Sequence, residues 1–141
     1  MKVLQFAFDA RESSNYLPHT YPTNCVVYTG THDNDTTRGW YHEVGKSARD
    51  FAKEYMCKPR LDEDSLVNDF IAMAMSSVAD LCVIPMQDYL NLGSEARINT
   101  PSTLGGNWVW RMKKKEFSDA VVEEMARVTK LYGRMPEEEE K

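Results

Sequence analysis

VVYTGTHDNDTT, residues 26–37, is the stretch that decides the fold, because a β-branched and aromatic run changes there abruptly into a polar cluster. Valine, tyrosine and threonine favour extended backbone, so we expect a strand over residues 25–31. The polar cluster at residues 32–37 must then be a loop or the beginning of a helix. Its side chains emerge at the C-terminal end of the strand.

Two further apolar runs predict strands on either side of this one. Residues 1–8 read MKVLQFAF and residues 81–86 read LCVIPM. Pro85 has no backbone N–H to donate, so it ends the strand at residues 81–86 early or places that strand at the edge of a sheet.

Three stretches have helical signals. Residues 47–57 and 64–79 lie between the second and third strands, and residues 118–131 begin at Ser118, a suitable N-cap, and stop before Gly133. Apolar residues recur at steps of three and four in the last two stretches, which predicts one buried face on each helix. These residues are Leu66, Phe70, Ile71, Ala74 and Val78 in the first of these two, and Val121, Val122, Met125, Val128 and Leu131 in the second.

Strand, polar loop, helices and strand is the order of βα units, which predicts an α/β fold with parallel strands. Three strands cannot close a barrel, and parallel strands buried on both faces need more partners than these. We therefore expect residues 1–136 to form part of a larger α/β domain, followed by an acidic tail at residues 137–141.

Composition limits the possible functions. The chain has 141 residues, of which 42% are apolar and 28% charged, as expected for one globular unit. Its net charge of −5 argues against a nucleic-acid partner, and its apolar runs are too short for a membrane span, so we expect a cytoplasmic protein without membrane contacts. The cysteines Cys25, Cys57 and Cys82 show no metal or redox spacing, which favours free and mostly buried thiols.

The polar cluster allows two interpretations. Asp33 could accept hydrogen bonds from neighbouring sugar hydroxyls while His32 donates one. The same cluster could equally be an Asx-turn and N-cap that opens a helix. A metal site built from His32, Asp33 and Asp35 is a poor third possibility, because all three ligands would lie in one loop.

The segments MKVLQFAF, NYLPHTYP, VVYTGTHDNDTTRGW, SEARINTP and GGNWVWR stand in the order seen in glycoside hydrolase family 77, the 4-α-glucanotransferases. The resemblance covers residues 1 to about 111. It implies the C-terminal βα units of a (β/α)8 barrel, whose active site lies at the C-terminal ends of the strands. It also implies transfer of α-1,4-glucan segments between maltooligosaccharides by a retaining mechanism, without a cofactor.

The resemblance assigns roles to individual residues. Asp33 would be the carboxylate that binds and distorts the ring under attack, with His32 as a neighbouring hydroxyl ligand. Asp9 would contact a sugar or be an exposed loop acid, and Asn99 with Arg97 would line the glucan groove or order the loop. The nucleophile and the general acid/base lie upstream in the family, so the chain alone is expected to be inactive.

Aromatic and histidine residues near these motifs carry weaker predictions. Trp40 and Tyr41 could stack on a sugar, but packing at the start of a helix is favoured. If NWVW is extended, Trp108 and Trp110 point oppositely, which predicts one in the core and one outside. Structural ordering is favoured for His19, and a surface position for His42.

Two alternatives to a part of an enzyme remain. The chain could be a non-catalytic glucan-binding module, in which case Asp33 would still be needed for binding. It could instead be a structural unit that forms homo-oligomers through exposed sheet edges.

Overall fold

A computed structural model describes residues 1–8 and 14–136. Asp9 and the acidic tail at residues 137–141 lie outside this described part, so the predictions made for them are not addressed. The strands are β1 (Lys2–Val3), β2 (Val26–Tyr28) and β3 (Leu81–Val83). The α-helices are α1 (Thr37–Glu43), α2 (Lys46–Tyr55), α3 (Glu63–Met75), α4 (Met86–Tyr89) and α5 (Asp119–Leu131), and short 3-10 turns cover Leu4–Phe6, Pro18–Thr20, Ser94–Ala96 and Lys114–Glu116.

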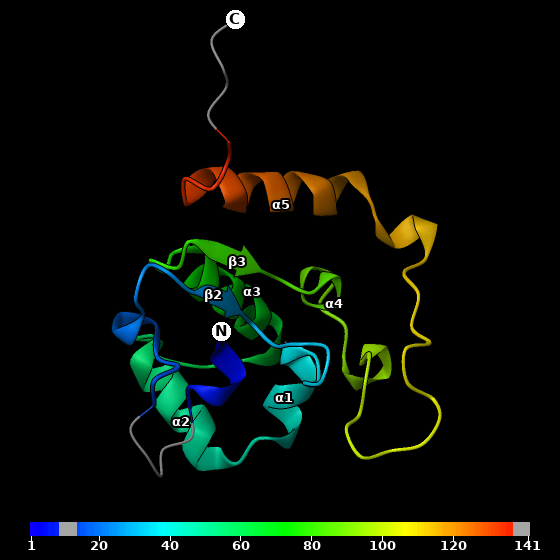
Figure 1. The fold of residues 1–141 in the computed structure, drawn as a ribbon. Helices are drawn as coiled ribbons and strands as arrows, with labels where there is room; N and C mark the ends of the chain where they lie inside the picture. Colours follow the sequence, from blue (N-terminus) through cyan, green and yellow to red (C-terminus); the bar gives the residue numbers. More distant parts are fainter. Residues whose placement is uncertain (9–13, 137–141) are drawn as a thin grey trace, which may run out of the picture.

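The three strands lie side by side in sequence order and all run parallel (Figure 1). Lys2 pairs with Val27, and Val27 pairs with Cys82. The predicted α/β class and the parallel order are therefore confirmed. The C-terminal ends of the strands meet at one edge of the sheet, where the polar cluster after β2 begins.

β1 is much shorter than the strand predicted over residues 1–8. The Gln5 N–H still donates to the Thr29 carbonyl at 3.2 Å, but the backbone has already tightened into the turn Leu4–Phe6. Ala7 and Phe8 are both buried after this turn, whereas in a continuous strand two neighbouring residues would point to opposite faces. The prediction was wrong here because core packing outweighed the local β-propensity.

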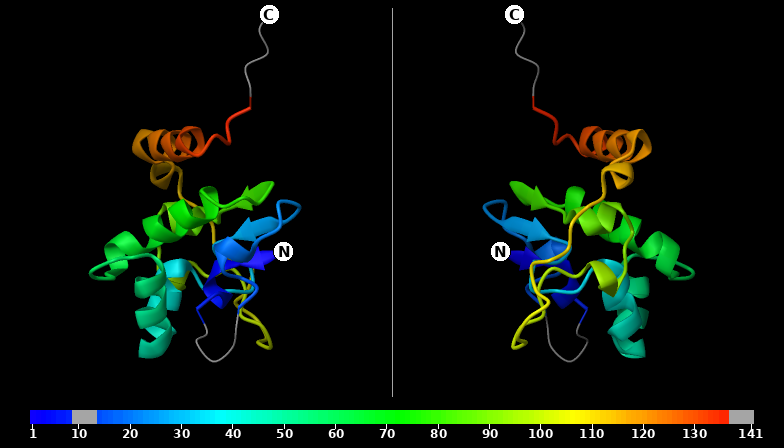
Figure 2. Two further views of the ribbon diagram at one scale, coloured as in Figure 1. Left: turned by 90° about the vertical axis from the view of Figure 1, so that its left-hand side faces the viewer. Right: turned by 90° about the vertical axis from the view of Figure 1, so that its right-hand side faces the viewer.

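Helices α1, α2 and α3 lie on one side of the sheet (Figure 2). Phe70 of α3 is fully buried and contacts Phe8, whose ring also lies against α2 through Phe51. Val27 of β2 faces this core and is fully buried, whereas its neighbours Val26 and Tyr28 are only partly covered. α3 ends at Met75, so Val78 lies beyond the helix and is 56% exposed, contrary to the predicted face.

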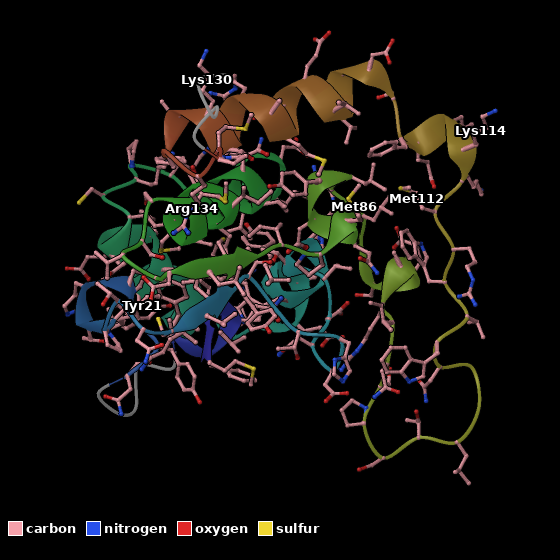
Figure 3. The ribbon with its side chains drawn as sticks, turned by 45° about the horizontal axis from the view of Figure 1, so that its top comes forward. Tyr21, Met86, Met112, Lys114, Lys130 and Arg134 are labelled. Atoms are coloured by element: carbon pink, nitrogen blue, oxygen red, sulfur yellow. The ribbon has the colours of Figure 1, made fainter. Side chains whose placement is uncertain are left out.

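α5 lies across the β3 side of the molecule and is less embedded than its periodicity predicted (Figure 1). Ser118 caps the helix as expected, through a hydrogen bond from the Val121 N–H. Val128 is its one buried residue, while Val122 and Leu131 are exposed. Arg134 points from the end of α5 back toward the body and donates to the carbonyls of Met75 and Ser77 (Figure 3). No helix within the described residues has the length and apolar character that a membrane crossing needs.

Candidate functional site

A cavity of about 560 Å³ opens at the C-terminal ends of the strands. Tyr28 of β2 and Val83 of β3 form its floor, on the sheet face opposite the helices. Its polar wall is the loop of residues 30–33. The remaining lining comes from Met1, Pro85, Met86, Gln87, Ile98 and Trp110. An apolar floor beside a short polar wall is the composition of a small-ligand site.

The side chains in the second half of the polar cluster, residues 34–36, form hydrogen bonds with nearby backbone N–H groups. The Asn34 side-chain oxygen accepts from the Thr31 N–H at 2.9 Å, and Asp35 accepts from the Thr36 N–H at 2.7 Å. Thr36 is the N-cap of α1 and accepts from the Gly39 N–H. The N-cap interpretation is therefore confirmed for Thr36, while Asn34 and Asp35 accept from backbone N–H groups of the loop itself.

His32 and Asp33 take no part in this capping and stay exposed beside the cavity. Their side chains are 53% and 52% exposed, and His32 Nε2 lies 3.4 Å from Asp33 Oδ2. Asp35, the third residue of the rejected metal set, is turned inward, where its Oδ2 accepts from the Ser94 hydroxyl at 2.6 Å. The described residues contain no group of three His, Cys, Asp or Glu side chains that could hold a metal ion.

A second segment, residues 97–99, fixes the direction of Asp33. The Asn99 side-chain amide donates to Asp33 Oδ1 at 2.7 Å, and the Arg97 guanidinium donates to the Asp33 carbonyl at 2.8 Å. Arg97 also donates to the Asn99 carbonyl, and the Asn99 N–H donates to the His32 carbonyl. The structure thus brings together three of the four predicted site residues, His32, Asp33 and Asn99, while Asp9 lies outside the described part.

Neither tryptophan of the NWVW segment is buried, so the prediction that one enters the core was wrong. Trp108 is 57% exposed and has a φ of 62°, a left-handed conformation that is unusual for a bulky residue. Its ring lies 5.1 Å from the His32 ring. Because the backbone turns at Trp108, the two side chains do not alternate as in a strand. Trp110, but not Trp108, lines the cavity.

The remaining aromatic and histidine predictions fall on the structural side. Trp40 packs against Phe8 and Phe70, and Tyr41 packs at the rim of the same core, as favoured above. His19 lies 3.0 Å from the Tyr55 hydroxyl, and the exposed His42 pairs with Glu63.

The cysteines are free, as predicted, although less buried than expected. Cys57 is exposed, whereas Cys25 and Cys82 are partly covered. Burial raises the pKa of the Cys82 thiol to about 11, so this group stays protonated at neutral pH.

Two residues near the site were given no role in the sequence analysis. Asp88 in α4 is 2% exposed and bonds to Thr29 and Thr37, which precede and follow the polar loop. Ser94 holds Asp35 from the same segment of the chain. Their partners are 51 to 59 residues away, so no local pattern could have shown these contacts.

Comparison with known proteins shows which family this chain belongs to. The sequence model of glycoside hydrolase family 77, described as 4-alpha-glucanotransferase, matches residues 1–117. This chain belongs to the 4-α-glucanotransferase family. The resemblance inferred from the five sequence segments is thereby confirmed.

Individual 4-α-glucanotransferases match nearly the whole chain. The protein from Clostridium butyricum is 49% identical over 136 residues, which are 95% of this chain and 27% of that protein. The chloroplastic/amyloplastic protein from Solanum tuberosum is 41% identical over 138 residues, 96% of this chain and 24% of the relative.

A solved structure agrees with this assignment. The amylomaltase from Streptococcus agalactiae, in complex with acarbose, superposes with a TM-score of 0.88 at 31% identity. The match covers 96% of this chain and 27% of that one. The chain therefore spans about a quarter of the length of the 4-α-glucanotransferases that it matches.

Proposed function

We propose that this chain supplies part of the glucan site of a 4-α-glucanotransferase and corresponds to C-terminal βα units of its (β/α)8 barrel. The parent activity would be transfer of α-1,4-glucan segments between maltooligosaccharides. Family membership supports the substrate class, and the cavity at the C-terminal ends of three parallel strands supports the position of the site.

The observation that carries the proposal is the state of the Asp33 carboxylate. Asn99 occupies Oδ1, while among the described residues Oδ2 has only His32 nearby, at 3.4 Å, and the group is half exposed beside the cavity. An ionised carboxylate has about four lone-pair sites. Asp33 is thus oriented by the protein and keeps free acceptor capacity for the hydroxyls of a glucose ring.

In the proposed reaction Asp33 binds two hydroxyls of the ring under attack and His32 donates to an adjacent one. Hydrogen bonds to charged acceptors are roughly twice as strong as neutral ones, so contacts that tighten as the ring flattens lower the barrier. A retaining reaction also needs a nucleophile and a general acid/base about 5 to 5.5 Å apart. We place both in the part of the parent enzyme that this sequence does not span, so this chain alone binds glucan without cleaving it.

The test is a titration of the ¹⁵N-labelled chain with maltoheptaose, and separately with acarbose, followed by NMR. We expect shift changes at the loop and at the Trp110 indole, and their loss in Asp33→Ala. Asp50→Ala is the matched control, because Asp50 is an exposed carboxylate whose one ion-pair partner among the described residues is Lys46. Shift changes confined to another face, or equal affinity of Asp33→Ala and wild type, would overturn the proposal.

A second candidate is self-association, which the open side of β3 favours. Within the described residues β3 pairs only with β2, so the backbone groups on its other side have no strand partner. Leu81 and Val83 are 54% and 40% exposed, and a groove of about 480 Å³ separates β3 from α5. Unpaired edges of this kind favour association. Light scattering at increasing concentration tests this, and a monomer at all concentrations would exclude it.

A further inference from the structure

The carboxylate of Asp88 holds together the two ends of the loop that carries the proposed site. Asp88 Oδ2 accepts from the Thr29 hydroxyl at 2.5 Å and from the Thr37 hydroxyl at 2.7 Å. Its Oδ1 accepts from the Thr37 N–H at 2.9 Å. Thr29 directly follows β2 and Thr37 is the first residue of α1, so one side chain spans the base of the loop of residues 30–36.

The chemistry of this contact requires a carboxylate. Three donors converge on one buried side chain, and only a group without its own N–H or O–H accepts from all of them. Burial raises the pKa of Asp88, and the hydrogen bonds from Thr29 and Thr37 act in the opposite direction. Packing alone would not call for a charged residue that is 2% exposed.

The segment that carries Asp88 also delivers the partners of Asp33. From α4 the chain runs to Ser94, which donates to Asp35, and then to Asn99, which donates to Asp33. The segment of residues 88–99 therefore contacts the loop at its base, its inner side and its outer side. If the base contact is lost, the distance between Asn99 and Asp33 is no longer fixed.

We propose that Asp88 is a positioning residue of this site, which sets the loop of His32 and Asp33 against the segment that ends in Asn99. The inference rests on the proposed function, because it concerns the same site. Asp88 does not line the cavity itself, although the preceding residue Gln87 does, and it acts on the site through Thr29 and Thr37.

The experiment is NMR and amide hydrogen exchange on the chain without saccharide. In Asp88→Asn we expect the Asn99 side-chain amide and the Asp33 backbone amide to shift. The Thr37 and Asn99 amide protons should exchange about tenfold faster, because loss of a hydrogen bond to a charged buried group favours local opening. Asp69→Asn is the control, since Asp69 is a largely covered carboxylate whose ion-pair partner is Lys58, and it should leave these signals unchanged.

A second pair of variants covers the case in which Asp88→Asn does not fold. Thr37→Val removes one hydroxyl donor at nearly constant volume, and Thr37→Ser restores it. We expect displaced Asn99 and Asp33 signals in the valine variant and wild-type signals in the serine variant.

The proposal is overturned if Asp88→Asn leaves the Asn99 and Asp33 signals at their wild-type positions and only makes the protein easier to unfold. Asp88→Asn would then behave like the control Asp69→Asn. Equal spectra of Thr37→Val and Thr37→Ser would overturn it as well. Because no saccharide is present, this outcome is independent of the maltoheptaose titration, in which failure of the proposed function would be seen.

Discussion

Gly39→Ala is the substitution for which the structure predicts the largest effect from a single methyl group. A Cβ atom at this position would lie 2.4 Å from the Asp35 carboxyl carbon and 2.4 and 2.5 Å from its two oxygens. Optimal contacts between carbon atoms are at about 3.5–4.0 Å, so the carboxylate must move. Asp35 is only 9% exposed and is held by Thr36 and Ser94, so it cannot move without losing hydrogen bonds.

The magnitude follows from three contributions to the free energy of unfolding. Overpacking costs about 1–3 kcal/mol, and leaving a buried carboxylate short of a partner costs about 1–3 kcal/mol more. Alanine is favoured over glycine inside a helix by about 1 kcal/mol, which offsets part of this loss. The middle of these ranges predicts that Gly39→Ala lowers the free energy of unfolding by about 3 kcal/mol.

Urea denaturation followed by circular dichroism measures this change. Gly45→Ala is the matched control, because nothing lies within 4 Å of a Cβ atom there and its φ of −64° suits alanine. Gly45 is the N-cap of α2, where glycine is favoured over alanine, so we expect the control to lose at most about 1 kcal/mol. In an Asp35→Ala background the cost of Gly39→Ala should vanish. An undiminished cost in that background would refute the reasoning, since the obstacle would then not be Asp35.

Three further predictions concern the core, a helix cap and the site. Phe70→Ala removes a fully buried ring between Phe8 and Trp40 and should cost about 3–5 kcal/mol in the same urea assay. The hydrogen bond from the Ser65 N–H lowers the pKa of Asp62, because it stabilises the ionised carboxylate. At neutral pH the wild type should therefore have a larger free energy of unfolding than Asp62→Asn. This difference should be lost as the pH falls through the lowered pKa, in unfolding curves taken from about pH 6 to 2. Asn99→Ala frees the Asp33 carboxylate to rotate and should weaken maltoheptaose binding about tenfold by NMR titration, whereas Thr103→Ala should not.

The sequence predicted those elements whose signal is local. β2 and β3 lie within the predicted runs, and β3 ends before Pro85, because β-branched residues and a missing N–H act at their own positions. The caps of α5 and the placement of α2 and α3 followed from the same kind of signal. For α1 the sequence indicated only a possible N-cap, because the residues that the helix buries are Thr37 and Gly39, and no apolar periodicity marks such a helix.

Only the exposed residues of the candidate site could be predicted from the sequence. His32, Asp33 and Asn99 belong to motifs of the family and were found in that way. Asp88 was missed because MQDY reads as an ordinary amphipathic turn, and its threonine partners lie in a distant part of the chain. The position of Trp108 was missed because its left-handed backbone breaks the alternation on which the prediction relied.

The polar cluster was treated as either a helix cap or a sugar-binding group, whereas our proposal divides these two tasks along the chain. Asn34 and Thr36 direct their oxygens to backbone N–H groups, which fixes the loop, while Oδ2 of Asp33 has only His32 nearby among the described residues. Stability and binding should therefore separate within a few residues. Thr36→Ala should lower the free energy of unfolding by about 1 kcal/mol, as expected for loss of an N-cap. Asp33→Ala should leave stability nearly unchanged and abolish glucan binding, because a half-exposed acceptor contributes little to the fold.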